Sequence, residues 1–245
     1  MARILVTGST EGLGYATAEA LLAEGHDVVV HARNDRRADA LGPLLDRGAD
    51  LLVADFADRD QTVNAVAELN DAAPIDVVIH NAGAVSGAAV MPVNVVAPFL
   101  FTAGLLGPRR HIYLSSGLHR GGRPSLDGVD WTGAHAAGSY SDSKLFVTTL
   151  SAAVARLRPD TLSNAVDPGW VPTRMGGAGA PDDLELGHRT QEWLAVSDDA
   201  EALTSGGYWY HSGLYQPHPA VHDRAFQDRL LASLEAATGV QLSPH

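Results

Sequence analysis

Short apolar runs of strand length recur along the chain, and segments with the periodicity of amphipathic helices separate them. The runs are RILVT (3–7), DVVVHA (27–32), DLLVAD (50–55), DVVIHN (76–81), RHIYLSS (110–116) and LSNAVDP (162–168). Helix-like segments lie between them, for example at 14–25 and 60–72. This alternation predicts right-handed βαβ units, and runs this rich in Val, Ile and Leu predict strands covered on both faces. We expect an α/β, doubly wound Rossmann fold with a mostly or wholly parallel sheet.

The length of the chain fits one α/β domain, so we expect residues 1–245 to form a single Rossmann-type domain. A Gly-rich stretch at 176–181 is expected to be a hinge near the start of a segment, about 174–215, that we expect to act as a substrate lid. A C-terminal helix is predicted at about 220–237. The acidic stretches PDD (181–183) and SDDAE (197–201) predict helix N-termini, where carboxylates oppose the helix dipole.

Charge and composition exclude several classes of function. A formal net charge of −12 argues against a nucleic-acid partner, because such proteins neutralise phosphates with a basic face. The sequence has no cysteine, which excludes disulfides, a thiolate nucleophile and a Cys-ligated zinc site. The longest apolar run (95–107) is shorter than the roughly 20 residues that cross a bilayer. We therefore expect a cytoplasmic protein without a membrane or nucleic-acid partner.

Glycines follow the first predicted strand, in TGSTEGLG (7–14). Glycines at a strand-to-helix turn let phosphates approach the N-terminal amides of the helix, so we expect a dinucleotide here. The second strand ends in HARN, with Ala32 and Arg33 where an NAD site places an acid. A guanidinium suits a 2′-phosphate, which favours NADP(H) over NAD(H). Alternatively, Arg33 is a solvated loop residue and Asp35 is the acid. Arg36 and Arg37 could assist the phosphate, but a solvated helix face is the expectation we prefer for both.

The stretch SYSDSK contains Lys144, the only lysine among 17 basic residues. If a helix begins here, Tyr140 and Lys144 lie one turn apart on the same face. A free tyrosine has a pKa of about 10, and a nearby ammonium favours the phenolate, so we expect Lys144 to lower the pKa of Tyr140. The alternative is a surface contact. Ser115 and Ser116 end the fifth predicted strand, at the sheet edge where doubly wound folds bind ligands.

With TGSTEGLG, HNAG (80–83), YSDSK (140–144) and DPGWVPT (167–173) in this order, the chain resembles the short-chain dehydrogenase/reductase family of the classical type. The resemblance extends from residue 3 to about residue 175. SSGLH and the later SGGYW (205–209) resemble the retinol dehydrogenase and WW-domain oxidoreductase branch of that family. The fold that this resemblance implies agrees with the one that the hydrophobic pattern predicts.

The resemblance implies four catalytic residues. Tyr140 is the general acid/base, and Lys144 tunes it and binds the nicotinamide ribose. Ser116 orients the substrate oxygen, with Ser115 as the alternative. Asn94 matches the fourth residue; Pro98 has no N–H to bond its carbonyl, which would leave that carbonyl free for a relay water. The alternative for Asn94 is a helix cap.

The resemblance also implies a set of cofactor-binding residues, spread over the carboxyl ends of the predicted strands. Asp55 matches the acid that bonds the adenine amine, and Val171 and Thr173 match the groups that bond the carboxamide. The full set is Gly8, Ser9, Thr10, Gly12, Leu13, Gly14, Arg33, Asp55, Phe56, Asn81, Ala82, Gly83, Tyr140, Lys144, Pro168, Gly169, Val171 and Thr173.

These observations predict an NADP(H)-dependent oxidoreductase that interconverts a carbonyl and a primary or secondary alcohol by hydride transfer, with tyrosine as the acid/base. The alternatives are a non-catalytic NAD(P)-binding sensor or scaffold, and an epimerase or dehydratase on the same scaffold. The substrate is a small molecule of unknown identity, and a monomer and a homodimer are both open. Three lid aromatics suggest a partly aromatic pocket: Trp193, Trp209 and Tyr210. We predict no metal site, because His218 and His222 lack a completing carboxylate or cysteine.

Overall fold

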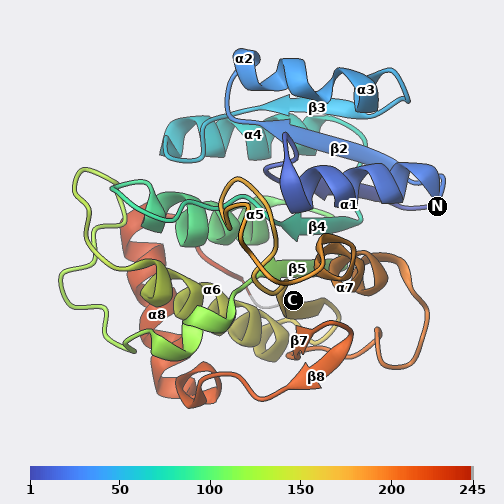
Figure 1. Cartoon of the computed structure of the whole chain (residues 1–245). Coiled ribbons are helices and arrows are strands. Elements are labelled where there is room, and N and C mark those ends of the chain that lie inside the picture. The colour runs from blue at the N-terminus through green and yellow to red at the C-terminus, as the bar shows by residue number, and fades with distance from the viewer. Residues whose placement is uncertain (244–245) are drawn as a thin grey trace.

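An eight-stranded sheet runs through the protein, and all of its strands except the last are parallel (Figure 1). The computed structural model describes residues 1–243. The strand order is β3-β2-β1-β4-β5-β6-β7-β8, and β8 pairs antiparallel with β7. The strands are β1 (Arg3–Val6), β2 (Asp27–Ala32), β3 (Asp50–Val53), β4 (Val77–His80), β5 (Arg110–Leu114), β6 (Leu162–Asp167), β7 (Tyr208–Tyr210) and β8 (Gly213–Tyr215).

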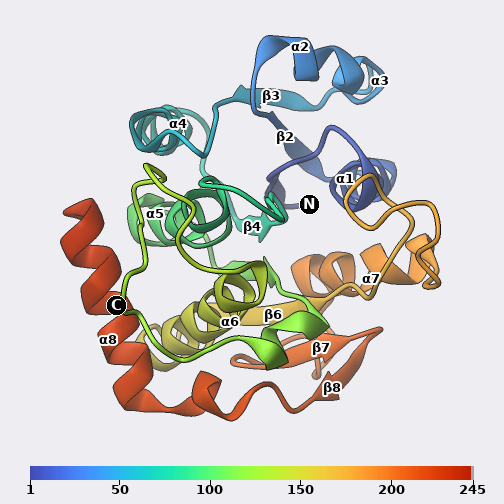
Figure 2. The same ribbon diagram turned by 60° about the vertical axis from the view of Figure 1, so that its left-hand side comes forward.

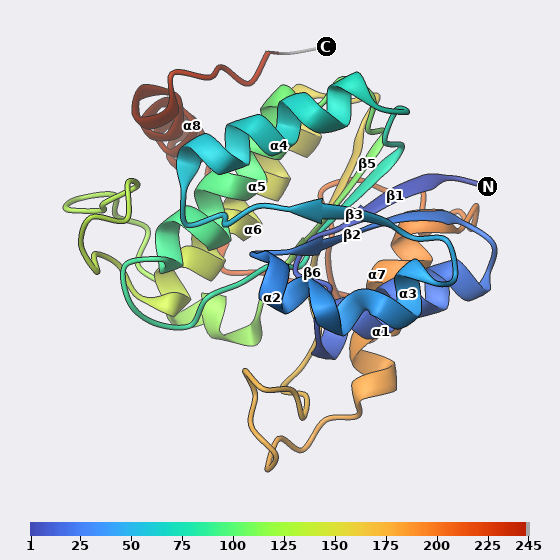
Figure 3. The ribbon, with the colours of Figure 1, turned by 90° about the horizontal axis from the view of Figure 1, so that it is seen from above.

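Helices cover both faces of this sheet (Figures 1 and 3). α1 and α7 pack together on one face, α4, α5 and α6 lie on the other, and α8 packs outside α6. Between residues 1 and 243, no helix is long and apolar enough to cross a membrane. The helices are α1 (Gly12–Ala23), α2 (Asp35–Ala38), α3 (Gly42–Leu45), α4 (Arg59–Asp71), α5 (Ala97–Gly104), α6 (Tyr140–Leu157), α7 (Leu184–Val196) and α8 (Arg224–Thr238).

The core forms on the two faces of the sheet because successive strand residues point to opposite sides. In β1, Ile4 and Val6 join the cluster under α1 and α7, whereas Leu5 joins the cluster under α4 and α5. A further cluster lies between α6 and α8, where Phe146 packs against Phe226. Strands that bury both faces need continuous apolar sequence, and the predicted runs have it.

The predicted fold class is confirmed, and all six predicted strands are present with ends that differ by no more than two residues. The sequence did not reveal β7 and β8, which have three residues each and were assigned to the expected lid. The prediction that a helix begins at 197–201 is wrong: Ser197 ends α7, and turns follow it. Asp183 does cap α7, as the pattern at 181–183 indicates.

The segment 174–215, predicted to be a lid, is not uniform. α7 packs on α1, and β7 pairs with β6 inside the sheet. Only the loop between β6 and α7 reaches the opening beside the start of α1, where Thr173 lies close to Gly12 (Figure 2). Any substrate lid therefore consists of this loop alone.

The order in which the chain adds strands to the sheet reverses at β1. After β1 the chain adds β2 and β3 on one side, and it then returns to add β4 on the other side of β1. In a doubly wound fold such a switch point leaves a crevice at the carboxyl ends of the two strands. Asn81, just after β4, bridges it: its side-chain amide donates to the carbonyls of Thr7 (2.8 Å) and Gly8 (3.1 Å). The turn after β1 is thereby held against the end of β4.

Two histidines lie side by side within the sheet, on the neighbouring strands β4 and β5. His80 and His111 are fully buried and share a hydrogen bond of 3.0 Å between Nε2 and Nδ1, and the His80 ring stacks on Tyr113. Burial lowers the pKa of His80 well below its usual value and that of His111 to about 3. Both imidazoles are therefore neutral in the folded protein.

This pair makes folding stability sensitive to acid. In the unfolded chain these histidines take up protons below pH ~6.5, whereas in the folded protein they stay neutral. The stability that the folded protein has above that pH is therefore lost as the pH falls. We expect the free energy of unfolding to drop between pH ~7 and pH ~5 by about 2 kcal/mol for each such histidine. In His80→Asn the drop, measured by urea denaturation at the two pH values, should be smaller by about 1 kcal/mol or more.

The control for that experiment is His222→Asn, because His222 is exposed and should leave the pH dependence unchanged. An equal drop in wild type and His80→Asn would contradict the assignment.

Candidate active site

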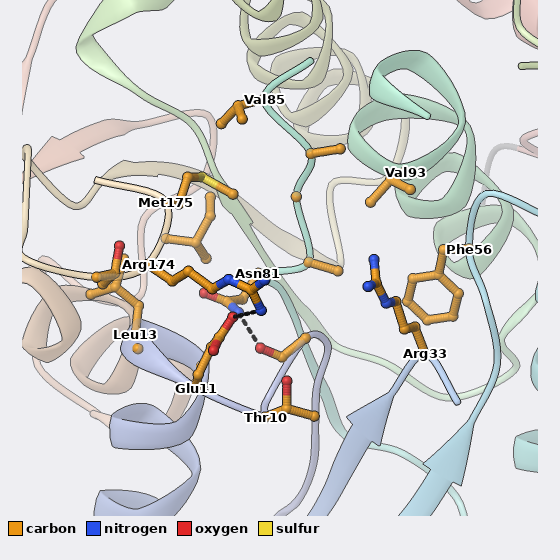
Figure 4. A pocket seen from close by; sticks show the side chains of 18 of the residues that line it. Thr10, Glu11, Leu13, Arg33, Phe56, Asn81, Val85, Val93, Arg174 and Met175 are labelled. Carbon is orange, nitrogen blue, oxygen red and sulfur yellow. Dashed lines mark hydrogen bonds and ion pairs between the residues drawn. The ribbon is translucent and has the colours of Figure 1, made fainter. Parts of the chain in front are cut away.

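A cavity of about 600 Å³ opens at the carboxyl edge of the sheet, above the switch point. Its wall is built from the turn after β1, the ends of β2 to β5, the first turn of α6 and the loop after β6. On this wall, Figure 4 shows Thr10 and Glu11 from the turn between β1 and α1, Leu13 from the start of α1, and Arg174 and Met175 from the loop after β6. Segments far apart in sequence therefore form one site.

The turn after β1 follows a path that only glycine allows at two positions. Gly8 has φ +68°, and a Cβ there would lie 2.8 Å from the Cα of Ala82. Gly14 begins the buried side of α1, where a Cβ would lie 2.4 Å from the carbonyl oxygen of Gly8. The glycines thus let the turn pack directly against the end of β4 and against its own helix.

His31 supports this turn, a role that the sequence analysis missed. Its Nδ1 accepts a hydrogen bond from the N–H of Gly8 (2.9 Å), so its Nε2 carries the proton and donates to the carbonyl of Ala54 (2.8 Å). The ring stacks on Phe56 at 4.0 Å. Burial lowers the pKa of His31 to about 4, which keeps Nδ1 free to accept at neutral pH. The imidazole therefore links the ends of β1, β2 and β3.

Arginine side chains gather near the end of β2. Arg33 is exposed on the cavity wall, and its guanidinium makes no ion pair or hydrogen bond within residues 1–243 (Figure 4). The expectation that Arg37 lies on a solvated helix face is wrong: it donates to the hydroxyl of Thr10 (2.8 Å) and pairs with Glu11 (3.0 Å). α2 is a single turn of four residues, and from it the side chain of Arg37 extends back toward the glycine turn after β1. Arg174 approaches the same carboxylate at 3.8 Å.

Tyr140 is the first residue of α6 because a capping box ends the preceding loop there. The Ser139 hydroxyl accepts from the N–H of Asp142 (3.0 Å), and the Asp142 carboxylate accepts from the N–H of Ser139 (3.1 Å). Asp142 also accepts from Arg123, which ties the long segment before the helix to its N-terminus. The predicted helix start is confirmed, and it places Tyr140 on the cavity wall.

Lys144 lies one turn further along α6, with its Nζ 5.5 Å from the centre of the Tyr140 ring. The side chain is only 5% exposed, and the ammonium donates to the carbonyl of Leu114 at the end of β5 (2.6 Å). Burial lowers the pKa of Lys144 to about 8, and the negative charge of Asp167 opposes this shift. The amine is thus held in place and close to its titration point at neutral pH.

The expectation that Lys144 lowers the pKa of Tyr140 is wrong in this structure. Burial raises the pKa of the phenol above its usual value; a hydrogen bond from Ser116 lowers it, and the charge of Asp167 raises it. The ammonium of Lys144 is directed at a backbone carbonyl, so desolvation of the phenol outweighs the attraction. At neutral pH Tyr140 is therefore a protonated phenol, ready to donate.

The two serines at the end of β5 have different surroundings. Ser115 is buried, and its hydroxyl shares a hydrogen bond of 2.6 Å with Thr148 of α6. Ser116 is partly exposed; its hydroxyl accepts from the N–H of Leu118 and lies within hydrogen-bonding range of Tyr140. Ser116 is thus the hydroxyl available beside the phenol. Its carbonyl accepts from Nδ1 of His119 (2.7 Å), a further residue that the sequence analysis did not single out.

Asn94 is buried in a π-helical turn, Pro92–Val96, directly before α5. Its side chain accepts from the N–H of Ala84 (2.7 Å) and donates to the carbonyl of Ala84 (2.9 Å) and the hydroxyl of Ser143 (2.8 Å). It therefore ties the segment after β4 to α6 and does not cap a helix. That its carbonyl holds a relay water stays a prediction.

Most of the predicted cofactor residues line the cavity, but three do not. Ser9 is buried. Its hydroxyl donates to the carbonyl of Val6 and accepts from the N–H of His31, and its N–H donates to the carbonyl of His31. Gly169 and Val171 are absent from the wall, and Val171 packs inward instead. The predicted cofactor residues that do line the cavity are Gly8, Thr10, Gly12, Leu13, Gly14, Arg33, Asp55, Phe56, Asn81, Ala82, Gly83, Tyr140, Lys144, Pro168 and Thr173.

The expected aromatic pocket is not formed by the predicted residues. Trp193 and Trp209 pack edge to face at 5.2 Å on the α1 and α7 side of the sheet, away from the cavity. Trp170, in the loop after β6, is 61% exposed and donates to the carbonyl of Gly176 (2.8 Å). Apart from Phe56 and the ring of Tyr140, the apolar groups on the cavity wall are aliphatic and include Val85, Val93 and Met175.

Comparison with known proteins gives a consistent result. The family model described as short chain dehydrogenase matches residues 2–107. The chain is 36% identical to short-chain dehydrogenase chry4 of Gibberella zeae, over 99% of each protein. It is 33% identical to short-chain dehydrogenase chyC of Penicillium rubens, again over 99% of each. These relatives contradict the predicted retinol dehydrogenase and WW-domain oxidoreductase branch, which is therefore wrong.

Among solved structures, the Pseudomonas aeruginosa RhlG/NADP active-site complex superposes with a TM-score of 0.69 at 24% identity. The match covers 85% of this chain and 94% of that one. At this identity the similarity shows the fold alone.

The close packing of the glycine turn predicts a sharp contrast between two substitutions. Gly14→Ala places a methyl group 2.4 Å from a carbonyl oxygen, so we expect the free energy of unfolding to fall by about 2 kcal/mol or more. Gly42→Ala, at a helical position with no atom within 4 Å of the added Cβ, should be neutral or slightly stabilising. Urea denaturation of both variants measures the difference, and equal stabilities would contradict the described packing.

Proposed function

The chain belongs to the short-chain dehydrogenase family, and from this premise we propose that it is an NADP(H)-dependent oxidoreductase that interconverts a carbonyl and a primary or secondary alcohol. The observation that carries the proposal is that the Tyr140 and Lys144 pair and the glycine turn lie on the wall of the same cavity. A site that only bound a nucleotide would need the turn but not the pair.

The cavity suits a nicotinamide dinucleotide. The side chain of the N-cap residue Glu11 makes no capping hydrogen bond to α1, which leaves the first amides of the helix to bind a pyrophosphate. Phe56 and Asp55 at the end of β3 would flank the adenine, and Thr173 and Pro168 stand at the opposite end of the site. The volume of about 600 Å³ is within the range of cofactor sites.

The charges at the end of β2 favour the phosphorylated cofactor. Ala32 ends the strand where an NAD-binding acid would stand, and Arg33 follows it on the wall, with a guanidinium that pairs with no group of residues 1–243. Arg37 adds a second guanidinium near the same place, partly neutralised by Glu11. The NADP complex of RhlG, a protein of the same fold, is consistent with this preference.

A nicotinamide bound here would supply the hydride chemistry at the substrate carbon. Tyr140 donates its proton to the carbonyl oxygen in reduction and accepts it back in oxidation. The Ser116 hydroxyl beside it orients the same oxygen as negative charge develops. Lys144, with a pKa of about 8, binds the cofactor ribose and exchanges protons with solvent, and Asn94 positions the segments on either side of the pair.

The substrate is a small molecule with an apolar part. Val85 and Met175 stand on the cavity wall and are each about half exposed, 49% and 50% respectively. They belong to separate segments, the one after β4 and the one after β6. An apolar group next to the reacting carbonyl would bury them, which contributes affinity without demanding one particular shape.

Removing the acid tests the mechanism. Tyr140→Phe keeps the ring and loses the proton, so we expect turnover to fall by at least about 100-fold while the Kd for NADPH changes only a few-fold. NADPH oxidation with phenanthrenequinone as carbonyl probe, together with a fluorescence titration of NADPH, measures both quantities. A variant that kept more than about a tenth of wild-type turnover would exclude Tyr140 as the acid.

Removing the guanidinium of Arg33 tests the cofactor preference. Arg33→Ala should weaken NADPH binding by about 10-fold, since it loses charge-assisted hydrogen bonds to the 2′-phosphate, and should leave NADH binding nearly unchanged. Arg36→Ala is the matched control, because Arg36 is exposed and is not on the cavity wall. Equal losses for the two cofactors would remove Arg33 from the phosphate site.

A further inference from the structure

His119 is a buried histidine next to the proposed catalytic serine, and the proposed mechanism gives it no task. It lies in a short 3₁₀ helix, Gly117–Gly121, that follows Ser116 at the end of β5. Its exposed fraction is 0%. A buried imidazole needs hydrogen-bond partners for its ring nitrogens, and the partners that His119 has indicate what it does.

Both ring nitrogens of His119 are bound, and the two bonds fix the position of the proton. Nδ1 lies 2.7 Å from the carbonyl oxygen of Ser116, which can only accept. Nε2 lies 3.0 Å from the backbone nitrogen of His218, which can only donate. The proton is therefore on Nδ1, and Nε2 carries none. Burial lowers the pKa of His119 below its usual value, in agreement with a neutral ring.

The partner of Nε2 belongs to the run Pro217–Pro219, which follows β8. Proline has no N–H and restricts its own backbone, so His218 supplies the one backbone donor of this run, from a stiff stretch of chain. Arg120 adds a second link, because it donates to the carbonyl of Gln216 (2.6 Å). The chain after β8 is thereby fastened to the turn after β5.

The hydrogen bond from Nδ1 acts on the residue that carries the proposed catalytic hydroxyl. The Ser116 carbonyl accepts both from Nδ1 and from the N–H of His119 (3.0 Å), so its peptide group is held by two donors. The Ser116 hydroxyl is the N-cap of the 3₁₀ helix and accepts from the N–H of Leu118 (3.2 Å). This bond uses a lone pair of Oγ and leaves the hydroxyl proton for another acceptor.

In the proposed mechanism that acceptor is the substrate oxygen. A donor stabilises the charge that develops on such an oxygen only if it is in place before the reaction. Ser116 lies within hydrogen-bonding range of the Tyr140 phenol, so a rotation of its peptide group would move Oγ away from the point where the proton is transferred. His119 opposes that rotation.

We infer that His119 is a positioning residue of the proposed active site: its Nδ1–H clamps the carbonyl of Ser116, and the Pro217–Pro219 run holds the ring, so that the Ser116 hydroxyl is aimed at the substrate oxygen. The inference rests on the proposed function, because it assigns a task to the residue that supports the serine of that mechanism. His119 is not on the cavity wall, so its effect on turnover passes through Ser116.

Two substitutions separate the two bonds of His119. Asparagine has an amide N–H at the δ position and can still donate to the Ser116 carbonyl, but it is too short to accept from His218. Glutamine has an oxygen at the ε position and can still accept from His218, but it has no donor at the δ position. Both lose the ring and its contact with Tyr208, whose ring centre lies 4.6 Å away, so each variant is the control for the other.

We expect His119→Gln to lower kcat by about 10-fold while KM changes only a few-fold, because Ser116 is no longer held. His119→Asn should keep at least about a third of the wild-type kcat. NADPH oxidation with phenanthrenequinone measures both constants. A purely structural role does not distinguish the two bonds, so a kcat of His119→Asn that is no higher than that of His119→Gln would overturn the inference.

The same change in a protein without the serine hydroxyl shows whether the effect passes through Ser116. Ser116→Ala alone should lower kcat by about 100-fold. Adding His119→Gln should then lower it by less than about 2-fold more, because the two residues act as one unit. A further loss of about 10-fold would show that His119 acts elsewhere and would overturn the inference. Full turnover of Ser116→Ala would do the same.

A measurement on the wild-type protein needs neither substrate nor cofactor, and it applies even if His119→Gln does not fold. NMR of the imidazole nitrogens of the 11 histidines distinguishes the two neutral tautomers, and His119→Asn identifies the signals of His119. We expect a neutral ring with the proton on Nδ1 at pH ~7. A proton on Nε2 would exclude the bond to Ser116 and overturn the inference. The proposed function is tested separately, by the turnover of Tyr140→Phe.

Discussion

The whole site depends on the hydrogen bonds that close the switch point between β1 and β4. The Thr7 hydroxyl accepts from the N–H groups of Asn81 and Ala82, while the Asn81 amide donates to the carbonyls of Thr7 and Gly8. Parallel strands that part at a switch point leave polar groups at their ends, and here those groups satisfy one another. The glycine turn is thereby rigid before any ligand arrives, which lowers the entropic cost of binding.

The proposed catalytic pair shows burial prevailing over proximity. Lys144 sits near the Tyr140 ring, yet desolvation disfavours the charged form of both side chains, so it raises the pKa of the phenol and lowers that of the amine, which moves the two values apart. The ammonium is anchored to a strand carbonyl and not to the phenol. The pair in this structure therefore consists of a neutral acid and a cation that is easily deprotonated, an arrangement suited to passing a proton along.

The strand frame could be predicted from sequence because strands buried on both faces need continuous apolar residues, and β1 to β6 have them. β7 could not be predicted, because its three aromatic residues are too few to show the alternation of a strand. Motif spacing located Tyr140 and Lys144, because two residues that are four apart at the start of a helix lie on the same face of it. The role of His31 comes from contacts with residues far along the chain, such as Gly8 and Ala54, and no local pattern encodes those contacts.

The solitary lysine has a practical consequence. Apart from the N-terminal amine, the side chain of Lys144 is the one primary amine in the sequence, and it is buried at the floor of the cavity with a pKa of about 8. A reagent that modifies amines, such as an aldehyde followed by reduction, can attach to a side chain at this single position. Any molecule that fills the cavity shields it. Covalent labelling followed by mass spectrometry would thus report occupancy of the site without knowledge of the substrate.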